Sequence, residues 1–470
     1  MCSAGYPNPG MNSFLTLIQV LAARRAQEKS CGWTRVALRD HQSRSLAALR
    51  AYAMAASPFY RDFHRGREHA PLEELPILTK ARLMENFDRL VTDRRIRLAD
   101  AESYLAAEAG AKRYLDRYVV LATSGSTGRR GVFVFDPREW IRAVAAITRP
   151  IAWAQAGQSR RRPPRAALIA SAASWHYSAR VGLALQNRLV PALRLDAAAP
   201  MGELIAALNQ WRPEALATYP SVLRELAAAA QANELRIPLQ HVATSAEVLT
   251  DEVRESVRSA WNIRVQDTYG ATEFAPIASE CPLGRKHLFE NGAIIEAVDD
   301  AGHQVPAGER GTRLLLTVFD RRTQPLIRYE LSDMVRMSEE PCSCGRPYRI
   351  LESIDGRLED VLHFPAKSGQ ASVAIHPNQF HEVLERLAVD VWQVERTVDA
   401  LNIRLVGREA PRQAPIAAVR VETLLATAGA VAPAVRVMVV DRLERGPSGK
   451  APLIVSRVRL GAYPASLRGG

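Results

Sequence analysis

Short β-type runs alternate with helical patterns between residues 118 and 270, and this alternation limits the fold more than any other feature of the chain. The β-type runs cover 118–121, 132–135, 166–170, 215–218, 240–243 and 263–267, and the helical patterns include 201–211, 221–233 and 250–261. Such alternation is typical of βαβ units around a largely parallel sheet. From 284 to 340 the pattern changes to β-runs with turns, such as 293–298 and 312–319, which predicts a smaller antiparallel, barrel-like part.

The two ends of the chain differ from its middle. Residues 1 to about 115 are mainly helical in pattern, and Thr79 is a candidate N-cap for the helix that follows it. Near Asp355 a compact α+β unit begins, with helices expected at 377–387 and 413–428 and strands at 391–397, 402–406 and 434–440. Because 470 residues exceed the usual size of a single core, we expect two domains. The predicted class is α/β, with a large N-terminal domain at 1–355 and a small mobile α+β C-terminal domain at 356–470.

The net charge of +12 invites a nucleic-acid partner, but the distribution of the charge argues against one. Nearly all of it is arginine, which is spread along the chain without a basic tail or interleaved aromatic residues. No apolar run approaches the roughly 20 residues that a membrane span needs. The apolar segment 14–23 is followed, not preceded, by its basic residues, which is the wrong order for a signal peptide. We therefore expect a cytoplasmic protein with no nucleic-acid or membrane partner.

A loop rich in hydroxyl groups and glycine lies between two apolar β-runs. Residues 120–122 lead into Thr123-Ser-Gly-Ser-Thr-Gly128, and Arg129-Arg-Gly131 leads out into the run 132–135. Glycine lets successive backbone N–H groups face one side and the hydroxyls add donors, so such a loop suits the phosphates of a nucleotide. The alternative is an ordinary Ser/Gly turn in a hairpin. A Walker-type loop is excluded, because it needs Gly-Lys-Ser/Thr and a helix directly after it.

Two further segments place chemically active side chains at the ends of β-runs. Asp267-Thr-Tyr-Gly-Ala-Thr-Glu273 offers an aromatic ring, a hydroxyl and a carboxylate beyond the run 263–266, where a nucleotide site in an α/β sheet is expected. Gln324-Pro-Leu-Ile-Arg-Tyr329 is followed by Asp333, whose carboxylate could accept hydrogen bonds from a ribose diol. Taken singly, the first segment is equally compatible with an ordinary strand end, and a lone Asp is more often a turn residue.

Together and in this order, these pieces resemble the adenylate-forming superfamily of acyl-CoA synthetases, peptide-synthetase adenylation domains and luciferases. The phenylacetate–CoA ligase-like branch is the most similar. The other segments that carry the resemblance are Ser57-Pro-Phe-Tyr60, Leu75-Pro-Ile-Leu-Thr-Lys80, Ser245-Ala-Glu247, Gly356-Arg-Leu-Glu-Asp360 and Pro447-Ser-Gly-Lys450. They extend over nearly the whole chain, and their joint occurrence is far more specific than any one of them.

The resemblance implies an AMP-forming acid–thiol ligase. A carboxylate would attack the α-phosphate of ATP to give an acyl-adenylate and pyrophosphate, and the thiol of CoA would then form a thioester after the C-terminal domain rotates about a hinge. The implied catalytic residues are Lys450, Thr272, Glu273 (also the ligand of Mg²⁺) and Arg357. The residues implied to bind ATP are Thr123, Ser124, Gly125, Ser126, Thr127, Gly128, Ser245, Ala246, Glu247, Tyr269, Gly270 and Asp333.

The chain also departs from the family pattern. Arg129 and Arg130 stand where Pro-Lys often follows the phosphate loop, Ser245 replaces a glycine, Glu359 replaces the usual Asp or Lys, and no clear Gly-rich turn follows the hinge. Adenylation is therefore better supported than the choice of thiol. The nearest rival is transfer of the acyl group to a carrier-protein thiol or to an amine, and a zinc-containing nucleic-acid-binding protein is the rival from another class. The oligomeric state, including a homodimer, stays open.

Four residues form a candidate metal site. Cys281, His287, Cys342 and Cys344 supply three thiolates and one imidazole, a set suited to tetrahedral Zn²⁺. The alternative is three unrelated reduced cysteines and a surface histidine, because Cys-x-Cys is tighter than the usual Cys-x₂-Cys spacing. Some members of the branch carry a metal site of this kind, which favours a structural zinc that ties the segment after Glu273 to the segment before the hinge.

The acid substrate is expected between the phosphate loop and Tyr269. The candidate pocket residues are Trp175, His176, Tyr177, Tyr219 and Thr244. Their aromatic character favours an aromatic or otherwise flat carboxylic acid, although aromatic residues at such positions more often pack in a core.

Overall fold

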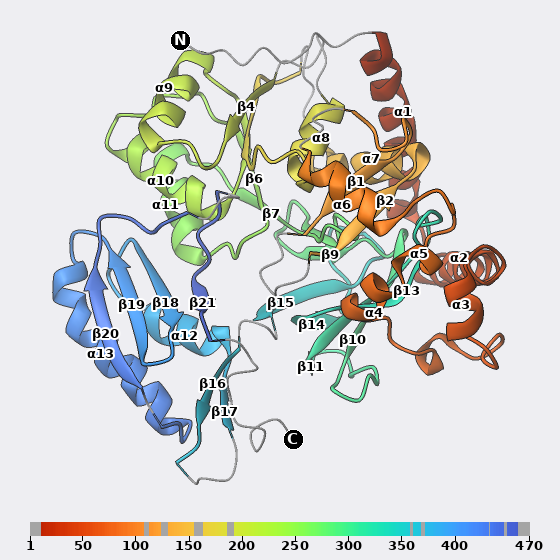
Figure 1. The fold of residues 1–470 in the computed structure, drawn as a ribbon. Helices are drawn as coiled ribbons and strands as arrows, with labels where there is room; N and C mark the ends of the chain where they lie inside the picture. Colours follow the sequence, from red (N-terminus) through yellow and green to blue (C-terminus); the bar gives the residue numbers. More distant parts are fainter. Residues whose placement is uncertain are drawn as a thin grey trace.

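The computed structural model describes residues 11–107, 112–123, 130–154, 163–185, 192–357, 361–367, 372–431, 433–445 and 449–458. The N-terminal part is mainly helical, as predicted, and lies on one side of the molecule (Figure 1). Its α-helices are α1 (Met11–Glu28), α2 (Arg35–Ala56), α3 (Pro58–Phe63), α4 (Lys80–Glu85), α5 (Phe87–Leu90) and α6 (Leu98–Ala106), with single 3₁₀ turns at Lys29–Gly32 and Leu72–Glu74. Thr79 caps α4, because its hydroxyl accepts the backbone N–H of Arg82 at 3.2 Å. None of the described helices is both long and apolar enough to cross a membrane.

A ten-stranded sheet runs through the middle of the molecule in the order β11-β14-β15-β9-β8-β7-β6-β5-β3-β4. Its parallel half alternates strands and helices: β3 (Ala166–Ala170), α8 (Tyr177–Leu185), β4 (Ala192–Asp196), α9 (Met201–Trp211), β5 (Ala215–Thr218), α10 (Pro220–Gln231), β6 (His241–Ser245), α11 (Asp251–Trp261) and β7 (Val265–Tyr269). The predicted βαβ units are confirmed here, since β3, β4, β5, β6 and β7 all pair in parallel. The sequence pattern missed only β4.

The first two strands correct part of this prediction. Strands β1 (Val119–Ala122) and β2 (Val132–Phe135) do not join the parallel sheet but form an antiparallel pair of their own. The physical reason is the length of the connection, because residues 123–131 are too few for the crossover of a dozen or more residues that parallel neighbours need. Helix α7 (Pro137–Ala154) follows β2 directly.

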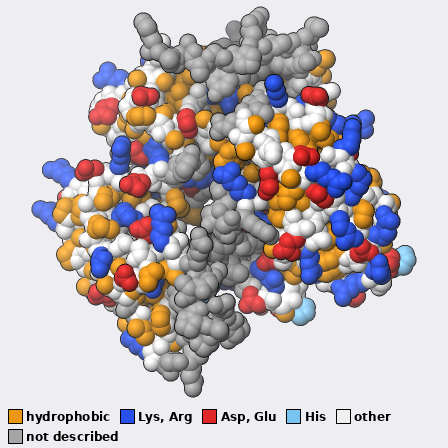
Figure 2. Space-filling model, viewed as in Figure 1, with side chains coloured by type: hydrophobic (Ala, Val, Ile, Leu, Met, Phe, Trp, Pro, Cys, Tyr) orange, Lys and Arg blue, Asp and Glu red, His pale blue; other side chains and the backbone are white. Residues whose placement is uncertain are grey.

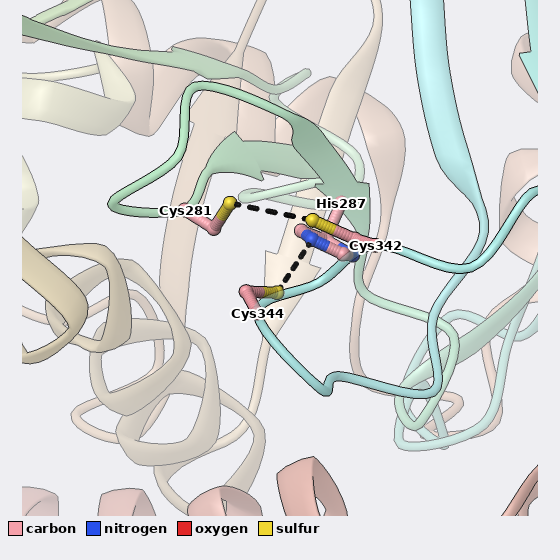
Figure 3. A group of neighbouring side chains, drawn as sticks. All are labelled: Cys281, His287, Cys342 and Cys344. Atoms are coloured by element: carbon pink, nitrogen blue, oxygen red, sulfur yellow. Dashed lines mark hydrogen bonds between the residues drawn. The ribbon is translucent and has the colours of Figure 1, made fainter.

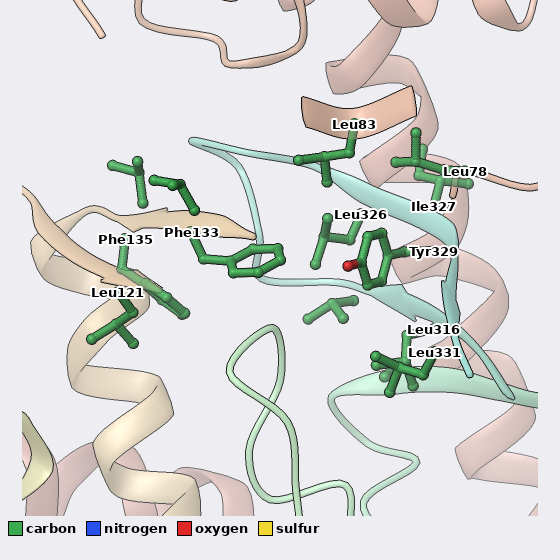
Figure 4. Packing of buried hydrophobic residues seen from close by; sticks show 14 of the residues in the cluster. Leu78, Leu83, Leu121, Phe133, Phe135, Leu316, Leu326, Ile327, Tyr329 and Leu331 are labelled. Atoms are coloured by element: carbon green, nitrogen blue, oxygen red, sulfur yellow. The ribbon is translucent and has the colours of Figure 1, made fainter. Parts of the chain in front are cut away.

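The antiparallel region predicted from 284 to 340 is present and is divided between two sheets. Strands β8 (Ala278–Glu280), β9 (Lys286–Leu288), β11 (Arg310–Gly311), β14 (Asp333–Ser338) and β15 (Ile350–Arg357) extend the large sheet, and β10 (Ala293–Val298), β12 (Arg313–Val318) and β13 (Leu326–Leu331) form a three-stranded sheet. The main hydrophobic core lies between these strands, the β1–β2 pair and the N-terminal helices (Figure 4). Phe133 and Tyr329 meet there edge to face with ring centroids 6.0 Å apart.

The C-terminal part has a core of its own. It contains β16 (Leu362–Pro365), β17 (Ser372–Ile375), α12 (Pro377–Leu384), β18 (Val391–Arg396), β19 (Ala400–Val406), α13 (Ala410–Thr427), β20 (Ala434–Val439) and β21 (Ile454–Ser456). Its buried apolar side chains all come from residues between 362 and 454. The helices and strands match the predicted α+β unit within a few residues, while the β16–β17 hairpin and β21 were not foreseen. The exact boundary between 355 and 356 stays a prediction.

Charged side chains of both signs are mixed with apolar ones on the face shown in Figure 2, without one continuous basic area. Arginine therefore lies beside acidic partners in many places, as in the pairs of Arg95 with Asp93 and Arg404 with Glu395, each at 2.6 Å.

Low pH is expected to lower the free energy of unfolding because of the buried His64. This ring is fully buried against Tyr60 and Phe63, and neither ring nitrogen has a hydrogen-bond partner among the described residues. Burial, with a smaller contribution from Arg50 and Arg67, lowers the pKa of His64 from 6.5 to about 4. Between pH 6.5 and pH 4, His64 therefore binds a proton in the unfolded chain but not in the folded protein. The free energy of unfolding falls as the pH drops through this range.

The free energy of unfolding falls by as much as about 3 kcal/mol between these pH values. We expect His64→Leu to flatten this part of the stability curve in urea unfolding measured at pH 7 and pH 4.5. His69→Leu, at an exposed position, is the control and should keep the wild-type pH dependence. An unchanged curve in His64→Leu would contradict the role given to His64.

Candidate functional site

The carboxyl ends of four parallel strands bring the predicted site segments to one edge of the sheet. Strands β3, β5, β6 and β7 end at Ala170, Thr218, Ser245 and Tyr269. The segments that follow them carry the predicted residues 175–177, 219–221, 245–247 and 269–273. In open α/β sheets this edge is where ligands bind.

Glu247 joins this edge to the C-terminal part. Its carboxylate accepts the backbone N–H of Ser221 at 2.9 Å, the Ser221 hydroxyl at 3.1 Å and the backbone N–H of Ala451 at 3.1 Å. Burial raises the pKa of Glu247, while these hydrogen bonds and the charge of Lys450 act in the opposite direction. The segment before it is strained, because Ala246 has a positive φ of 72° that a side chain with Cβ rarely adopts.

The docked C-terminal loop places Lys450 over the site edge. The Lys450 Nζ atom lies 5.5 Å from the centre of the Tyr219 ring. Burial, and next the charge of Lys450, lowers the pKa of His176 from 6.5 to about 4, so that this imidazole is neutral at pH 7. The Tyr219 hydroxyl accepts the backbone N–H of Ser171 at 3.0 Å, and burial raises its pKa. Lys450, His176, Tyr219 and Glu247 therefore meet, although they are far apart in the sequence.

The ends of the predicted phosphate loop are held together. Thr123 donates its backbone N–H to the carbonyl of Gly131 at 2.9 Å and accepts the N–H of Gly131 on its hydroxyl at 2.8 Å. The predicted residues Ser124, Gly125, Ser126, Thr127 and Gly128, together with Arg129, lie outside the described residues. Arg130 stacks on Trp175 at 4.7 Å, and the carbonyl of Trp175 accepts the N–H of Ala122 at 3.1 Å. The loop therefore starts and ends beside Trp175 and His176.

The segment 269–273 begins at the end of β7. An added Cβ at Gly270 would lie 3.0 Å from that of Ala275, so a side chain here would push Ala275 away by a few tenths of an ångström. The Glu273 carboxylate is buried and accepts the Tyr329 hydroxyl at 3.0 Å. Thr272 is half-buried in the turn between Gly270 and Glu273.

Asp333 and Arg357 lie opposite each other. They are backbone partners at the start of β14 and the end of β15, and Asp333 is buried. The side chain of Arg357 and the predicted hinge residues 358–360 lie outside the described part of the chain. The backbone thus brings the predicted ribose ligand to the predicted hinge.

Two of the predicted pocket residues, Thr244 and Tyr177, form hydrogen bonds within the protein. The Thr244 hydroxyl donates to Asp267 Oδ1 at 2.9 Å, and Lys286 Nζ donates to Asp267 Oδ2 at 2.6 Å. Tyr177 donates its hydroxyl to the carbonyl of Ala275 at 3.1 Å. Thr244 thus belongs to a buried polar network beneath the site edge, whereas Tyr177 supports the segment after Glu273.

Cys281, His287, Cys342 and Cys344 converge on one point (Figure 3). All four ligand atoms lie within 4.8 Å of one another, with 3.9 Å between the sulfurs of Cys281 and Cys342. Zn–S bonds of about 2.3 Å in a tetrahedron place sulfurs about 3.8 Å apart. His287 Nε2 lies 3.2 Å from Cys344 Sγ, while Nδ1 lies 3.2 Å from the Tyr348 carbonyl oxygen. That second contact suits a protonated Nδ1, which would leave Nε2 as the metal ligand.

Two buried charged residues near Glu273, Glu139 and Arg321, were not predicted from the sequence. Glu139 accepts the N–H of Asp136 at 2.8 Å in a reciprocal cap of α7, and it also accepts the N–H groups of Arg322 and Thr323 at 2.5 and 2.6 Å. The Asp136-Pro-Arg-Glu139 spacing is a readable capping-box signal. Arg321, buried over the Phe135 ring at 3.7 Å, has no comparable signal in the sequence.

Comparison with known proteins agrees with this geometry. Residues 73–315, just over half of the chain, match the family model of the AMP-binding enzymes. The chain belongs to the AMP-binding enzyme family. The phenylacetate–coenzyme A ligase of Thermus thermophilus is 28% identical over 185 residues, which are 38% of this chain and 40% of that protein. The CapK protein of Staphylococcus aureus is 22% identical over 72% of this chain and 70% of its own length.

Solved structures show that the fold is shared. A 2-hydroxyisobutyryl-CoA ligase in the postadenylation state, in complex with R3-HIB-AMP, superposes with a TM-score of 0.67 at 20% identity, and 88% of each chain is covered. The same enzyme in the thioesterification state, with 2-HIB-AMP and CoA, gives a TM-score of 0.53 at 19% identity, over 89% of this chain and 90% of that one.

We expect Glu247→Ala to release the C-terminal loop. The substitution removes the hydrogen bond of the Ala451 N–H and both Ser221 contacts, so amide exchange at 449–456 should become at least about tenfold faster by mass spectrometry, matching roughly 1–3 kcal/mol. Glu252→Ala is the control, because Glu252 pairs with Arg224 and no hydrogen bond joins it to the described loop residues 449–456. Equal exchange in both variants would show that Glu247 does not hold the loop.

Proposed function

We propose that this AMP-binding enzyme is an AMP-forming acid–CoA ligase, which converts a small carboxylic acid through an acyl-adenylate into a CoA thioester. The observation that carries the proposal is the position of Lys450, docked over Tyr219 beside His176 and Glu247 at the carboxyl edge of the parallel sheet. A lysine ammonium in that position can stabilise negative charge that develops on the reacting carboxylate and α-phosphate. The partial similarity to phenylacetate–coenzyme A ligases supports the same reaction class.

The roles of the other residues follow from their positions. The loop 123–128 is proposed to hold the phosphates of ATP, with Arg130 close to its exit. Ser245, Ala246 and Glu247 would border the adenine, Tyr269 and Gly270 would contact the nucleotide, and Asp333 would accept the ribose hydroxyls. Thr272 would donate to a phosphate, Arg357 would contact the nucleotide, and Glu273 would hold Mg²⁺, which neutralises phosphate charge when bound.

The neutral state of His176 suits its place beside Lys450. A protonated imidazole there would repel the ammonium group and weaken its attraction for the substrate carboxylate. Burial keeps His176 unprotonated above about pH 4, so Lys450 supplies the positive charge that acts on this imidazole. Trp175, His176, Tyr177 and Tyr219 are proposed to surround the acid near its carboxylate.

CoA is proposed as the acceptor, with a carrier-protein thiol or an amine as the alternative. Thiol attack on an adenylate needs access to a face that Lys450 and the C-terminal loop cover here. A rotation of the C-terminal part between the two half-reactions would open that face.

We also propose that the four converging residues bind a structural zinc ion. Three thiolates and one imidazole complete a tetrahedral set, so that no position remains for substrate. The ion would join the β8–β9 turn to the segment before β15 and would restrain both.

Pyrophosphate exchange with a panel of carboxylic acids tests the proposed reaction. At least one acid should support ATP-dependent exchange, and Lys450→Ala should lower its rate about 100-fold or more because a preorganised cation is lost. Lys367→Ala, at an exposed position of the C-terminal part, should leave the rate unchanged. Adding CoA should yield a thioester by mass spectrometry. Exchange that is indifferent to Lys450 would refute the proposed mechanism.

Metal analysis tests the zinc site. The purified protein should carry about one zinc per chain, and the double variant Cys342→Ser/Cys344→Ser should lose it together with several degrees of Tm, because metal binding stabilises only the folded chain. Cys31→Ser is the matched control, since Cys31 lies next to Arg149 and outside the cluster. Zinc that persists in the double variant would disprove the assignment.

A further inference from the structure

A buried hydrogen bond joins strand β13 to the end of the nucleotide segment. The hydroxyl of Tyr329 donates to Oε1 of Glu273 at 3.0 Å, although the two residues are 56 positions apart in the sequence. Tyr329 is fully buried, and Glu273 is 3% exposed. A hydrogen bond made away from water fixes the orientation of both groups, because leaving either one unpaired would be costly. The contact therefore gives this motif a second candidate role beside that of Asp333.

The Tyr329 side chain is held in one position by its neighbours. Its ring meets Phe133 edge to face with the centroids 6.0 Å apart (Figure 4). On the backbone, Leu78 donates its N–H to the carbonyl of Arg328 and accepts the N–H of Glu330, both at 3.0 Å. The chain on each side of Tyr329 is thus bonded to the segment that contains Leu78. The hydroxyl is a donor in a fixed place, as a group that orients a functional side chain has to be.

The preceding residue, Arg328, fixes the same stretch of β13. Arg328 is 3% exposed, and its guanidinium donates to the carbonyls of Glu73, Leu75 and Gly302 at 2.6, 2.8 and 2.8 Å. Its φ of 47° is positive, which is unusual for a residue with a long side chain. Such strain persists only where the surrounding contacts impose it. The backbone that presents Tyr329 is therefore set by tertiary contacts.

Gln324, five residues before Tyr329, holds the strand that leaves the predicted phosphate loop. Its side chain is fully buried, Oε1 accepts the N–H of Val134 at 3.0 Å, and Nε2 donates to the carbonyl of Val132 at 3.0 Å. Both backbone groups belong to β2, whose Phe133 ring packs on Tyr329. One short segment therefore contacts β2 through Gln324 and the nucleotide segment through Tyr329.

The Glu273 side chain has the chemistry of a magnesium ligand. Mg²⁺ takes oxygen donors in near-ideal octahedral geometry and is usually bound by one or two carboxylates together with substrate phosphates. Glu273 supplies a buried carboxylate at the end of the segment proposed to contact the nucleotide. A carboxylate has about four lone-pair positions, so a hydrogen bond from Tyr329 at one of them is compatible with a metal ion at another. Because Mg²⁺ tolerates little distortion, the orientation of this carboxylate affects the affinity for the metal.

We propose that Tyr329 is a positioning residue for the metal and triphosphate site. Its hydroxyl orients the Glu273 carboxylate for Mg²⁺, and its ring keeps that carboxylate in place relative to the strand that leaves the phosphate loop. Groups that orient a metal ligand in this way typically contribute about 10–100-fold to metal affinity or activity. The inference rests on the proposed acid-activating function and adds the residue that holds its metal ligand.

Nucleotide binding with and without metal tests the proposal. α,β-Methylene ATP cannot form an adenylate, so calorimetry on the full chain gives its Kd once in excess Mg²⁺ and once in EDTA. The ratio of the two Kd values measures the coupling between metal and nucleotide. Tyr329→Phe should lower this coupling about tenfold by weakening the complex with Mg²⁺ alone, and should leave the Kd in EDTA unchanged. In pyrophosphate exchange, the same variant should need more Mg²⁺ for the half-maximal rate and keep the KM for the acid.

Tyr60→Phe is the matched control. Tyr60 is also fully buried, and its hydroxyl donates to the Pro325 carbonyl at 2.9 Å and accepts the N–H of Ile327 at 3.2 Å. Both variants lose one buried hydroxyl bonded to this part of the chain, so both should lower Tm. Only Tyr329→Phe should lower the coupling. An equal fall in both variants would mean a general loosening of the segment and would overturn the role of Tyr329.

Glu273→Gln completes a double-mutant cycle. This substitution should lower the coupling by itself, and adding Tyr329→Phe to it should change little more, because the hydroxyl acts through the carboxylate. Wild-type coupling in Tyr329→Phe, or an equal effect of Tyr329→Phe with and without the Glu273 carboxylate, overturns the role of Tyr329 and leaves the ligase function standing. A wild-type protein that neither binds the analogue nor supports exchange with any acid overturns the proposed function itself.

Discussion

The shared carboxyl edge of the parallel strands is the constraint on which the rest of the structure depends. Strands β3, β5, β6 and β7 pair in one direction, so the four segments that leave them meet at one place although they are up to about a hundred residues apart. Their apolar residues hold them in register between α9, α10 and α11. The side chains of His176, Tyr219 and Glu247 therefore need no long loop to reach one another, and the C-terminal part has one fixed surface on which to dock.

Docking of the C-terminal part uses few but specific contacts. Glu247 receives Ala451 N–H, and Arg445 donates to the carbonyl of Ala197 at 3.1 Å and pairs with Glu225. Gly449 approaches Ala197 so closely that a Cβ would lie 2.5 Å from its side chain, and its φ of 76° also requires glycine. Polar contacts of this kind can hold Lys450 in place and would still break in the proposed rotation, whereas a large apolar interface would not.

The sequence predicted most elements because their local patterns agree with the tertiary structure. Helix 201–211 and strand 293–298 are found at the predicted bounds, since hydrophobic periodicity and burial coincide there. The pairing of β1 with β2 was missed because strand direction depends on the connection and not on composition. Ordered motifs identified the residues at the sheet edge. Arg321 was not identified, because an isolated arginine next to Arg322 carries no pattern, and its importance arises only from burial among residues of distant segments.

Lys286 links the Cys281–His287–Cys342–Cys344 cluster to the ends of β6 and β7. Lys286 lies between Cys281 and His287 in sequence, and its ammonium group is held 2.6 Å from Asp267, which in turn accepts the hydroxyl of Thr244. Asp267 precedes Tyr269 on β7 by two residues, and Thr244 precedes Ser245 on β6 directly. A turn closed by metal ligands would hold Lys286 in one position, and a fixed Lys286 would fix the ends of both strands. The cluster therefore has a physical route to the site edge although none of its four ligands lines that edge.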